Sequence, residues 1–406
     1  MLGLFLIYFA HEPFLWYKMC RGPFKRICHW GPITALAIIK VITFAAVHCC
    51  SMWWPPDGSA AGFLHLCVFL LFSGLTLYHF LSAMYVGPGY LPPGWMPEVT
   101  EHCEFLQFCN TCEGFKAPRT HHCRKCGRCV QKMDHHCPWI NNCVGHRNHA
   151  HFTAFLFFAV CGCLQATVVL GCSLYRALNR VWYLYYGTGA EPMVYLSVWM
   201  LVLCVFSLGL AIGVVLAVGM LLVIQLRGIH RNRTAVEDWI VEKARARRGA
   251  ADPPFVHPYD LGWRDNCRQV LSCSCDPRGD GLSWPVRDGC DQFTITREQK
   301  QQKLEKRQRT RVYTVHTPFS GAWFPVSHGW QVLCHPPFTD ESRIRLRRGD
   351  TIHVTRWRRH WLFGEKVAPG TEDGSDSASR VRGWFPRACV CEVMDGTADS
   401  ADKKVN

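Results

Sequence analysis

Acidic residues are scarce in this chain of 406 residues, which has 31 Asp and Glu against 45 Lys and Arg and a formal net charge of +14. Such a surplus of positive charge suits either nucleic acid or the anionic surface of a membrane. The basic residues form no element that could read a nucleic-acid groove, so nucleic acid is not expected as a partner. No internal repeat is visible either, and the length leaves room for two or three domains.

A recognisable signal for cleavage is also missing near the start. The apolar stretch Leu2–Ala10 resembles the core of a signal peptide, but it lacks a basic segment before it and a small-residue cleavage site after it. We therefore expect residues 1–31 to form a cytosolic N-terminal segment, part of which lies at the membrane interface.

Long apolar runs, in contrast, are abundant. Hydrophobic residues make up 49% of the chain, and four stretches reach the roughly 20 residues that a membrane-spanning helix needs. They are Pro32–Trp54, Gly62–Val86, Phe152–Tyr175 and Tyr195–Leu226. The predicted fold class is a polytopic α-helical membrane protein, with one pair of spans in 32–86 and another in 152–226, and the lipid bilayer is a partner.

The distribution of basic residues between the spans predicts the topology. Several precede the first span, none lies in the turn Pro55–Ala61, and many lie in the loop 87–151. Because Lys and Arg are enriched on the cytosolic side of membranes, both termini and this loop are expected in the cytosol.

The 24 cysteines suit metal binding better than disulfides. Several lie inside apolar runs, and eight fall between Cys103 and Cys143 at spacings typical of zinc sites. Two tetrahedral zinc sites need eight ligands, and structural sites have no open position. The loop supplies eight without Cys137: Cys109, Cys112, His122, Cys123, Cys126, Cys129, His136 and Cys143.

Cys137 is therefore surplus to the zinc ligands. It follows Asp134, His135 and His136 directly, and a thiol beside an imidazole can become a nucleophile. Spacing alone leaves a catalytic cysteine and a spare cysteine equally open. The third span begins shortly after the cluster, which holds Cys137 at the cytosolic face, where a fatty-acyl thioester has its tail in lipid and its CoA in water. This position favours S-acylation.

Three strings resemble the cysteine-rich domain of the DHHC palmitoyltransferases: Lys116-Ala-Pro-Arg-Thr-His-His-Cys123, Asp134-His-His-Cys-Pro-Trp139 and Asn141-Asn-Cys-Val-Gly145. With the four spans, the resemblance covers roughly residues 30–270. It implies that Cys137 is autoacylated from palmitoyl-CoA or another long-chain acyl-CoA, and that the acyl group then passes to cytosolic cysteines of membrane-associated proteins in a ping-pong mechanism. It also implies that His135 is the acid and base and that Asp134 orients it.

The resemblance also assigns ligands. It implies one zinc ion on Cys109, Cys112, His122 and Cys129, and a second on Cys123, Cys126, His136 and Cys143. Basic contacts to the CoA phosphates would come from Lys116, Arg119 and His121, which could otherwise be ordinary loop charges. Trp139, Phe152 and Phe155 would line the acyl cavity, although aromatic residues at a membrane boundary also serve as interfacial anchors.

Two motifs depart from the family pattern. Its Asp-Pro-Gly is Gly87-Pro88-Gly89 here, and its Thr-Thr-x-Glu is Thr234-Ala235-Val236-Glu237. The second departure removes a threonine hydroxyl, which puts in question any hydrogen bond that it makes to the catalytic Asp in relatives. Asn266 falls in a short C-terminal family motif and is expected to brace the fold.

After a cytosolic region, 227–311, that ends in the basic run Arg297–Arg311, the composition changes to short β-like segments at 312–395. This part resembles an SH3 domain, a small β-barrel, through Leu346–Asp350, Trp361–Gly364 with its groove tryptophan, and Gly383–Pro386. The aromatic opening motif is missing, so binding of Pro-rich ligands stays open, and a module that regulates the enzyme or recruits a partner is expected.

The tail, 396–406, ends in Lys403-Lys404-Val405-Asn406, a dilysine retrieval pattern. An enzyme of this family with an SH3-like tail resembles an endoplasmic-reticulum subgroup, so that membrane is the expected location. The alternative to an enzyme is a membrane scaffold that recruits partners through its zinc domain and tail. Cys273, Cys275 and Cys334 could themselves be acylated, but unmodified thiols are favoured.

Overall fold

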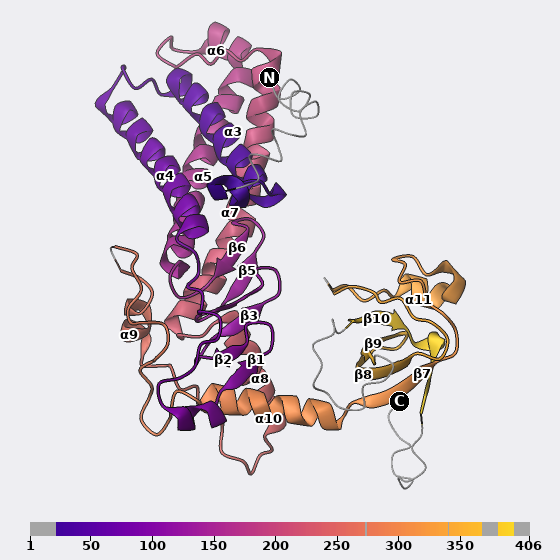
Figure 1. Ribbon diagram of the computed structural model, residues 1–406. Coiled ribbons are helices and arrows are strands. Elements are labelled where there is room, and N and C mark those ends of the chain that lie inside the picture. Colours follow the sequence, from indigo (N-terminus) through magenta and orange to yellow (C-terminus); the bar gives the residue numbers. More distant parts are fainter. Residues whose placement is uncertain (1–21, 273, 340, 368–380, 394–406) are drawn as a thin grey trace. The chain divides into compact units, whose positions relative to one another are not determined.

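The structure, a computed structural model, describes residues 22–272, 274–339, 341–367 and 381–393 (Figure 1). Contacts divide the chain into two compact units, Met1–Glu298 and Gln299–Asn406, which are described separately. The predicted interfacial segment Leu2–Ala10, Cys273 and the dilysine pattern at Lys403–Lys404 lie outside the described residues.

Four long helices dominate the first unit: α3 (Trp30–Trp53), α4 (Ala60–Tyr85), α5 (His149–Leu178) and α7 (Val198–His230). Their most apolar windows have a mean hydropathy of 2.0 to 2.9, and each helix is long enough to cross a bilayer. The prediction of four helices able to span a membrane is confirmed within the described residues. A short helix, α6 (Arg180–Tyr186), lies in the connection between α5 and α7.

Helix α5 is the centre of the bundle, since it contacts α3, α4 and α7. The contacts at one end of the bundle are made by small side chains, including Ala45, Cys49, Ala166, Cys204 and Ala211. In lipid no hydrophobic effect drives helices together, so close backbone approach through small residues is what stabilises such packing.

Three two-stranded antiparallel hairpins follow one another in the loop between α4 and α5 (Figure 1). They pair β1 (Gln107–Cys109) with β2 (Gly114–Lys116), β3 (His121–Cys123) with β4 (Arg128–Val130), and β5 (His135–Cys137) with β6 (Asn142–Val144). Each turn has a residue with positive φ just before its second strand: Glu113, Gly127 and Asn141. Hairpins with three-residue strands are not stable alone, so this domain depends on other cross-links.

The hairpins are copies of one unit, and this repeat was missed in the sequence. Cys109, Cys123 and Cys137 each end the first strand of their hairpin, at equal spacing along the chain. The pair His-His precedes the cysteine in the second and third hairpins but not in the first. The repeat is short and imperfect, which is why composition alone did not reveal it.

The first unit also contains α8 (Ala235–Arg247), α9 (Trp263–Arg268) and the start of α10 (Thr294–Gln308). Ile240, Val241, Tyr259, Trp284 and Ile295 form a small core among these segments. Asn266 connects α9 to the end of α7: its side-chain amide donates to the carbonyl of His230 at 2.8 Å, and its oxygen accepts from the backbone of Leu261 at 3.0 Å.

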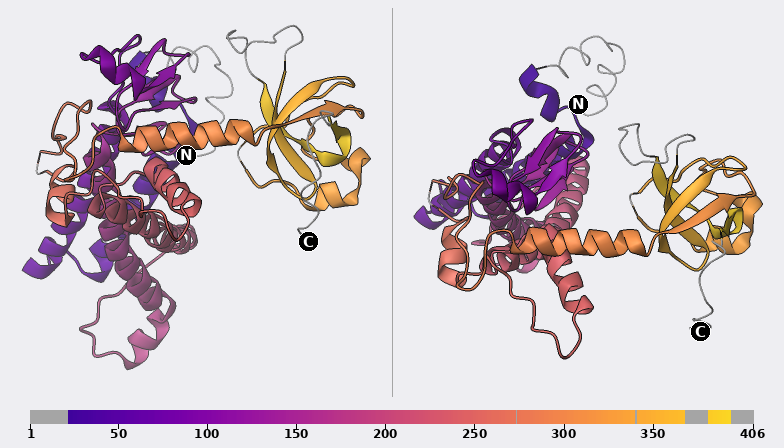
Figure 2. Two further views of the ribbon diagram at one scale, coloured as in Figure 1. Left: turned by 90° about the horizontal axis from the view of Figure 1, so that it is seen from below. Right: turned by 60° about the horizontal axis from the view of Figure 1, so that its bottom comes forward.

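The second unit contains a five-stranded antiparallel sheet with the order β10-β9-β8-β7-β11. The strands are β7 (Arg311–Val315), β8 (Thr351–Trp357), β9 (Trp361–Lys366), β10 (Arg382–Pro386) and β11 (Val390–Glu392), and a short helix, α11 (Trp330–Cys334), lies between β7 and β8. Both views in Figure 2 show that the sheet is curved. A shift in register between Val354 and Arg356 adds to this curvature.

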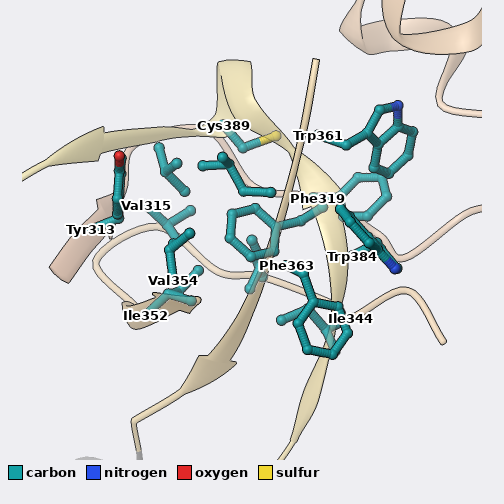
Figure 3. Packing of buried hydrophobic residues seen from close by; sticks show 14 of the residues in the cluster. Tyr313, Val315, Phe319, Ile344, Ile352, Val354, Trp361, Phe363, Trp384 and Cys389 are labelled. Carbon is teal, nitrogen blue, oxygen red and sulfur yellow. The ribbon is translucent and has the colours of Figure 1, made fainter. Parts of the chain in front are cut away.

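The core of this sheet is built around aromatic residues (Figure 3). Phe319, Trp361 and Phe385 are almost completely buried there. Trp361 has no exposed surface, and its indole nitrogen donates to the carbonyl of Val332 at 3.1 Å. The prediction that Trp361 is an open groove tryptophan is therefore wrong, because the segment between β7 and β8 covers the ring.

Substitution of this core tryptophan should destabilise the sheet. Trp361→Ala leaves a large cavity, and loss of a buried aromatic side chain costs about 3–5 kcal/mol. Trp330→Ala is the control, since Trp330 is 75% exposed and surface substitutions change stability by about 0.5 kcal/mol or less. Proteolysis of the full chain in increasing denaturant would measure both. Equal susceptibility of the two variants would contradict the packing described.

Candidate active site

The first cysteine/histidine cluster joins the first two hairpins. Cys109 and Cys112 come from the first hairpin, and His122 and Cys129 come from the second. The Nδ1 atom of His122 lies 3.5, 3.3 and 3.9 Å from the three sulfurs. In a tetrahedral zinc site a sulfur and a nitrogen ligand lie about 3.6 Å apart, so these four atoms could hold zinc.

The second cluster repeats this arrangement between the second and third hairpins. Cys123, Cys126, His136 and Cys143 bring one ligand atom each to a common point. His136 Nδ1 lies 3.6, 3.4 and 3.6 Å from the three sulfurs. The donor set of three thiols and one imidazole is typical of closed structural zinc sites. Both clusters could therefore bind zinc.

The repeat explains why Cys137 belongs to neither cluster. Each of the first two hairpins offers a Cys-x2-Cys pair to one cluster, and Cys137 starts the equivalent pair in the third. The second position of that pair is Ile140, which is fully buried in an apolar core. Cys137 thus occupies the position of a first zinc ligand, but the third hairpin lacks the second ligand, and among the described residues the sulfur of Cys137 belongs to no metal-binding group.

The carboxylate of Asp134 is held by donors from three different segments. His135 Nδ1 donates to Oδ2 at 2.7 Å, and Gln225 Nε2, on α7, donates to the same oxygen at 3.1 Å. The backbone N–H of Ala235, at the start of α8, donates to Oδ1 at 2.7 Å. The N-terminus of a helix attracts negative charge, so α8 adds to the stabilisation of the ionised carboxylate.

These contacts determine the charge of both catalytic candidates. Burial alone would raise the pKa of Asp134, but the hydrogen bond from His135, the nearby imidazoles and the Ala235 amide hold it well below its usual range. Burial alone would lower the pKa of His135, but hydrogen bonds with Asp134 and Cys137 raise it to about 9. The pair is therefore a carboxylate and an imidazolium near neutral pH.

Cys137 lies in the wall of an apolar cavity between the helices. The cavity has a volume of about 400 Å³, and all four long helices contribute to its wall. Trp139, Phe152 and Phe155 line it together with Cys137. The ring of Phe152 also contacts the imidazole of His135, with centroids 5.5 Å apart. A thiol, an imidazole and an apolar cavity therefore meet at one point.

Glycine lets the bundle approach the third hairpin closely. A Cβ atom on Gly31, in the first turn of α3, would lie 2.1 Å from the carbonyl oxygen of Pro138. A side chain at this position would push α3 away from the residue that follows Cys137.

Comparison with known proteins agrees with this geometry. A model of the DHHC palmitoyltransferase family matches residues 102–242, which include both clusters and Cys137. Palmitoyltransferase ZDHHC6 of Mus musculus is 42% identical over 392 residues, 93% of this chain and 94% of the relative. The Danio rerio protein of the same name is 43% identical over 390 residues, with 93% and 94% covered. This chain belongs to the DHHC palmitoyltransferase family.

A more distant relative supports the same activity. Probable protein S-acyltransferase 16 of Arabidopsis thaliana is 31% identical over 261 residues, 59% of this chain and 84% of the relative. The chain is therefore a DHHC-family protein S-acyltransferase. The alternative hypothesis of a non-catalytic membrane scaffold is not needed to account for its sequence.

The family residue Arg119 is not placed to contact CoA. Its side chain has no exposed surface, and its guanidinium makes two hydrogen bonds, of 2.6 and 2.7 Å, to the carboxylate of Glu237. It also donates to the side chain of Asn232 at 3.0 Å and lies over the rings of Tyr259 and Trp284. The expectation of a phosphate contact from Arg119 is corrected on these grounds. Lys116 and His121 are half-buried near the ends of β2 and β3.

Glu237 positions the start of α8. Its carboxylate accepts from the backbone N–H of Thr234 at 2.9 Å, and the Thr234 hydroxyl accepts from the backbone of Glu237 at 3.2 Å, which is a capping box. Arg119 lowers the pKa of Glu237 to about 2, although burial opposes this shift. Ala235 has no side-chain hydroxyl, and its backbone N–H is the donor to Asp134 from this turn.

The first departure, Gly87-Pro88-Gly89, forms a turn against the hairpins. Gly87 and Gly89 have φ of +75° and +84°, which favours glycine. The carbonyls of Pro88 and Gly89 accept from the backbones of Arg147 and Gln131 at 3.2 and 2.9 Å. Glycine at position 87 is thus compatible with the turn.

Several residues of the site were missed in the sequence. Gln225 contacts Asp134 and accepts from His149 Nε2 at 2.9 Å. Its polarity near the end of an apolar run was the available signal, since polar side chains in membrane helices are often functional. Asn232 is buried and accepts a hydrogen bond from Arg119. Nothing in its local sequence indicated that partner.

The buried ion pair predicts a specific pattern of stability. Arg119→Met should destabilise the fold by about 3–5 kcal/mol, because it leaves the Glu237 carboxylate buried without a partner charge. The double variant Arg119→Met/Glu237→Met should lose less than the single variant, although it also loses the capping box. Thermal unfolding of the purified chain in detergent would compare them. A double variant that is less stable than the single one would contradict an important role for the unpaired charge.

Proposed function

We propose that Cys137 accepts a long-chain acyl group from acyl-CoA and passes it to cytosolic cysteines of membrane-associated proteins. The observation that carries this proposal is the position of Cys137, which lies outside both metal clusters and in the wall of an apolar cavity, and whose thiol contributes to the raised pKa of His135. With Nδ1 of His135 bonded to Asp134, Nε2 is the nitrogen left for the thiol.

The proposed chemistry is a two-step transfer. The sulfur of Cys137 attacks the carbonyl carbon of acyl-CoA while His135 holds its proton, and the bond between that carbon and the CoA sulfur breaks. The imidazolium then protonates the departing CoA thiolate. In the second step a substrate thiol gives its proton to His135 and attacks the acyl-enzyme, and Cys137 is released. Asp134 keeps the imidazole oriented and favours its charged form.

The cavity supports a preference for long acyl chains. Its volume of about 400 Å³ falls within the range of about 300–1,000 Å³ for ligand pockets. Burial of each methylene contributes about 0.8 kcal/mol, so a chain that fills the cavity would bind much more tightly than a short one. Trp139, Phe152 and Phe155 are the proposed contacts nearest to Cys137. Lys116 and His121 are the proposed contacts to the CoA phosphates.

Two zinc ions are proposed as structural cofactors of the domain 87–151. One would bind Cys109, Cys112, His122 and Cys129, and the other Cys123, Cys126, His136 and Cys143. Bound zinc would cross-link neighbouring hairpins, which are too short to be stable without it.

The proposed location is the membrane of the endoplasmic reticulum, with both termini and the zinc domain in the cytosol. The support is the excess of basic residues in the 87–151 loop together with the dilysine pattern at the end of the chain.

The second unit is proposed to be an SH3-like module. The support is its five-stranded antiparallel sheet and the match of Gly383–Pro386 to β10. Trp361 is buried and cannot form part of a binding groove. A partner of this unit would therefore bind at a different surface. Recruitment of a protein partner is therefore proposed for the module without a polyproline site at Trp361.

Replacement of the nucleophile tests the function. The Cys137→Ser variant, supplied with labelled palmitoyl-CoA, should form no hydroxylamine-sensitive acyl-enzyme, while its zinc content stays unchanged. Cys103→Ser is the matched control, since Cys103 lies in the same loop outside both clusters, and it should be labelled like the wild type. Thioester label on Cys137→Ser with normal zinc content would overturn the assignment.

The backbone donor to Asp134 can be removed without loss of the helix. Ala235 is the first residue of α8, a position where proline fits and its missing N–H is not needed by the helix. Ala235→Pro should slow autoacylation by roughly 10-fold to 100-fold, since a hydrogen bond to a charged group contributes about 1.5–3 kcal/mol. Ala235→Ser keeps the N–H and should retain activity. Equal rates for both variants, measured with labelled acyl-CoA, would show that this donor is dispensable.

The pKa of His135 predicts how its contribution to stability depends on pH. Folding raises this pKa from 6.5 to about 9, so the stabilisation is complete below pH 6.5 and is lost as the pH rises through about 9. The difference in unfolding temperature between wild type and His135→Gln should therefore be largest below pH 6.5 and shrink towards pH 9. In an Asp134→Asn background, the difference in unfolding temperature caused by His135→Gln should vary less with pH. A difference in unfolding temperature that increases with pH would contradict a raised pKa of His135.

A further inference from the structure

A third group of metal-ligating side chains lies outside the two clusters of the zinc domain. Among the described residues, His79, His151 and Cys275 each bring one ligand atom to within 4.8 Å of the others. His79 lies near the end of α4, His151 in the first turn of α5, and Cys275 in the loop after α9. Residues that are far apart in the sequence therefore converge at one point.

The distances agree with a shared metal ion. The Nδ1 atoms of His79 and His151 are 3.1 Å apart, and two nitrogen ligands of a tetrahedral zinc ion lie about 3.3 Å apart. At the two clusters of the 87–151 domain the distances between histidine nitrogen and cysteine sulfur, 3.3–3.9 Å, likewise agree with tetrahedral zinc. The two imidazole nitrogens therefore have the spacing of a ligand pair, and the sulfur of Cys275 lies within 4.8 Å of both.

Aromatic neighbours hold the two imidazoles in place. The ring of His79 stacks on Phe158 with centroids 5.5 Å apart and an angle of 13°, and the ring of Tyr78 packs edge-on against both imidazoles. Both histidines are buried. Cys275 has a φ of +59°, an uncommon conformation for a residue other than glycine. The two imidazoles are thus held in place before any ion binds.

We propose that His79, His151 and Cys275 form a third metal site, which takes a divalent transition metal, with zinc as the best match. Two imidazoles and one thiolate suit zinc, whereas calcium and magnesium require oxygen ligands. Among the described residues three ligands come together, which leaves a fourth position for another ligand. Nothing in the family motifs of this chain includes these three residues, so the site is separate from the proposed zinc sites of the 87–151 domain.

Metal binding here would fasten the loop after α9 to the cytosolic ends of α4 and α5. His151 is the direct neighbour of Phe152, whose ring lines the cavity and contacts His135. An ion on His151 would therefore restrain the turn of α5 that shapes the cavity beside Cys137. The metal site itself does not depend on the proposed transfer chemistry, and it can be tested without measuring activity.

Metal content and thiol reactivity test the proposal together. The purified full chain, loaded with zinc and dialysed, should contain one metal ion more than His79→Ala or Cys275→Ala by mass spectrometry. Cys267→Ala, at a cysteine of α9 that belongs to none of the three groups, should keep the wild-type content. In wild-type protein a brief, mild chelator treatment that leaves the two clusters loaded should speed alkylation of Cys275 at least tenfold. His79→Ala should have the same effect without a chelator, and alkylation of Cys267 should not change.

The outcomes separate this site from the rest of the enzyme. If wild type and the variants hold equal numbers of metal ions, and neither chelator nor His79→Ala changes the alkylation of Cys275, the two imidazoles share only a hydrogen bond and the proposal is wrong. If a variant also loses the metals of the two clusters, the chelator experiment on wild-type protein tests the site instead: faster alkylation of Cys275 supports it, and an unchanged rate contradicts it. Loss of the third ion with normal labelling of Cys137 would support the site independently of the proposed function.

Discussion

The buried pair of Arg119 and Glu237 is the contact on which the geometry of the active site depends. Glu237 closes the capping box of α8 and at the same time binds the guanidinium of a residue from the zinc domain. The start of α8 is thereby fixed against the hairpins, where its first N–H reaches Asp134. Asp134 in turn accepts a hydrogen bond from His135. A buried ion pair contributes little net stability compared with apolar packing, but it specifies one arrangement of the partners.

The position of Cys137 outside both clusters follows from an incomplete repeat. Three hairpins share one plan, and each of the first two completes a metal-binding pair, whereas the third has Ile140 where the second ligand would be. A thiol at this place has no metal to bind, and the strand brings it beside an imidazole that is kept charged by a carboxylate. Because the third hairpin also packs against α3 and α5, the same thiol lies in the wall of the apolar cavity.

Expectations failed where a short motif had to predict which way a side chain faces. Arg119 lies in a basic family string and was expected at a phosphate, yet the guanidinium is enclosed by Glu237, Asn232 and two aromatic rings. Trp361 was expected in an open groove, yet the segment before β8 covers it. In both cases the partner comes from a part of the chain far away in sequence, so no local pattern could reveal it.

The amino-acid sequence alone determined the four apolar helices, the eight cysteine and histidine residues that could bind zinc, the surplus Cys137 with its neighbours, and the resemblance to the family. These features depend on residue type and on spacing along the chain, which covalent connection preserves. Only the tertiary structure decided that a backbone N–H of Ala235 serves Asp134, that Gln225 joins it, and that His79, His151 and Cys275 meet. Such contacts require distant segments to pack at a defined distance, and that distance is set by the whole of the first unit.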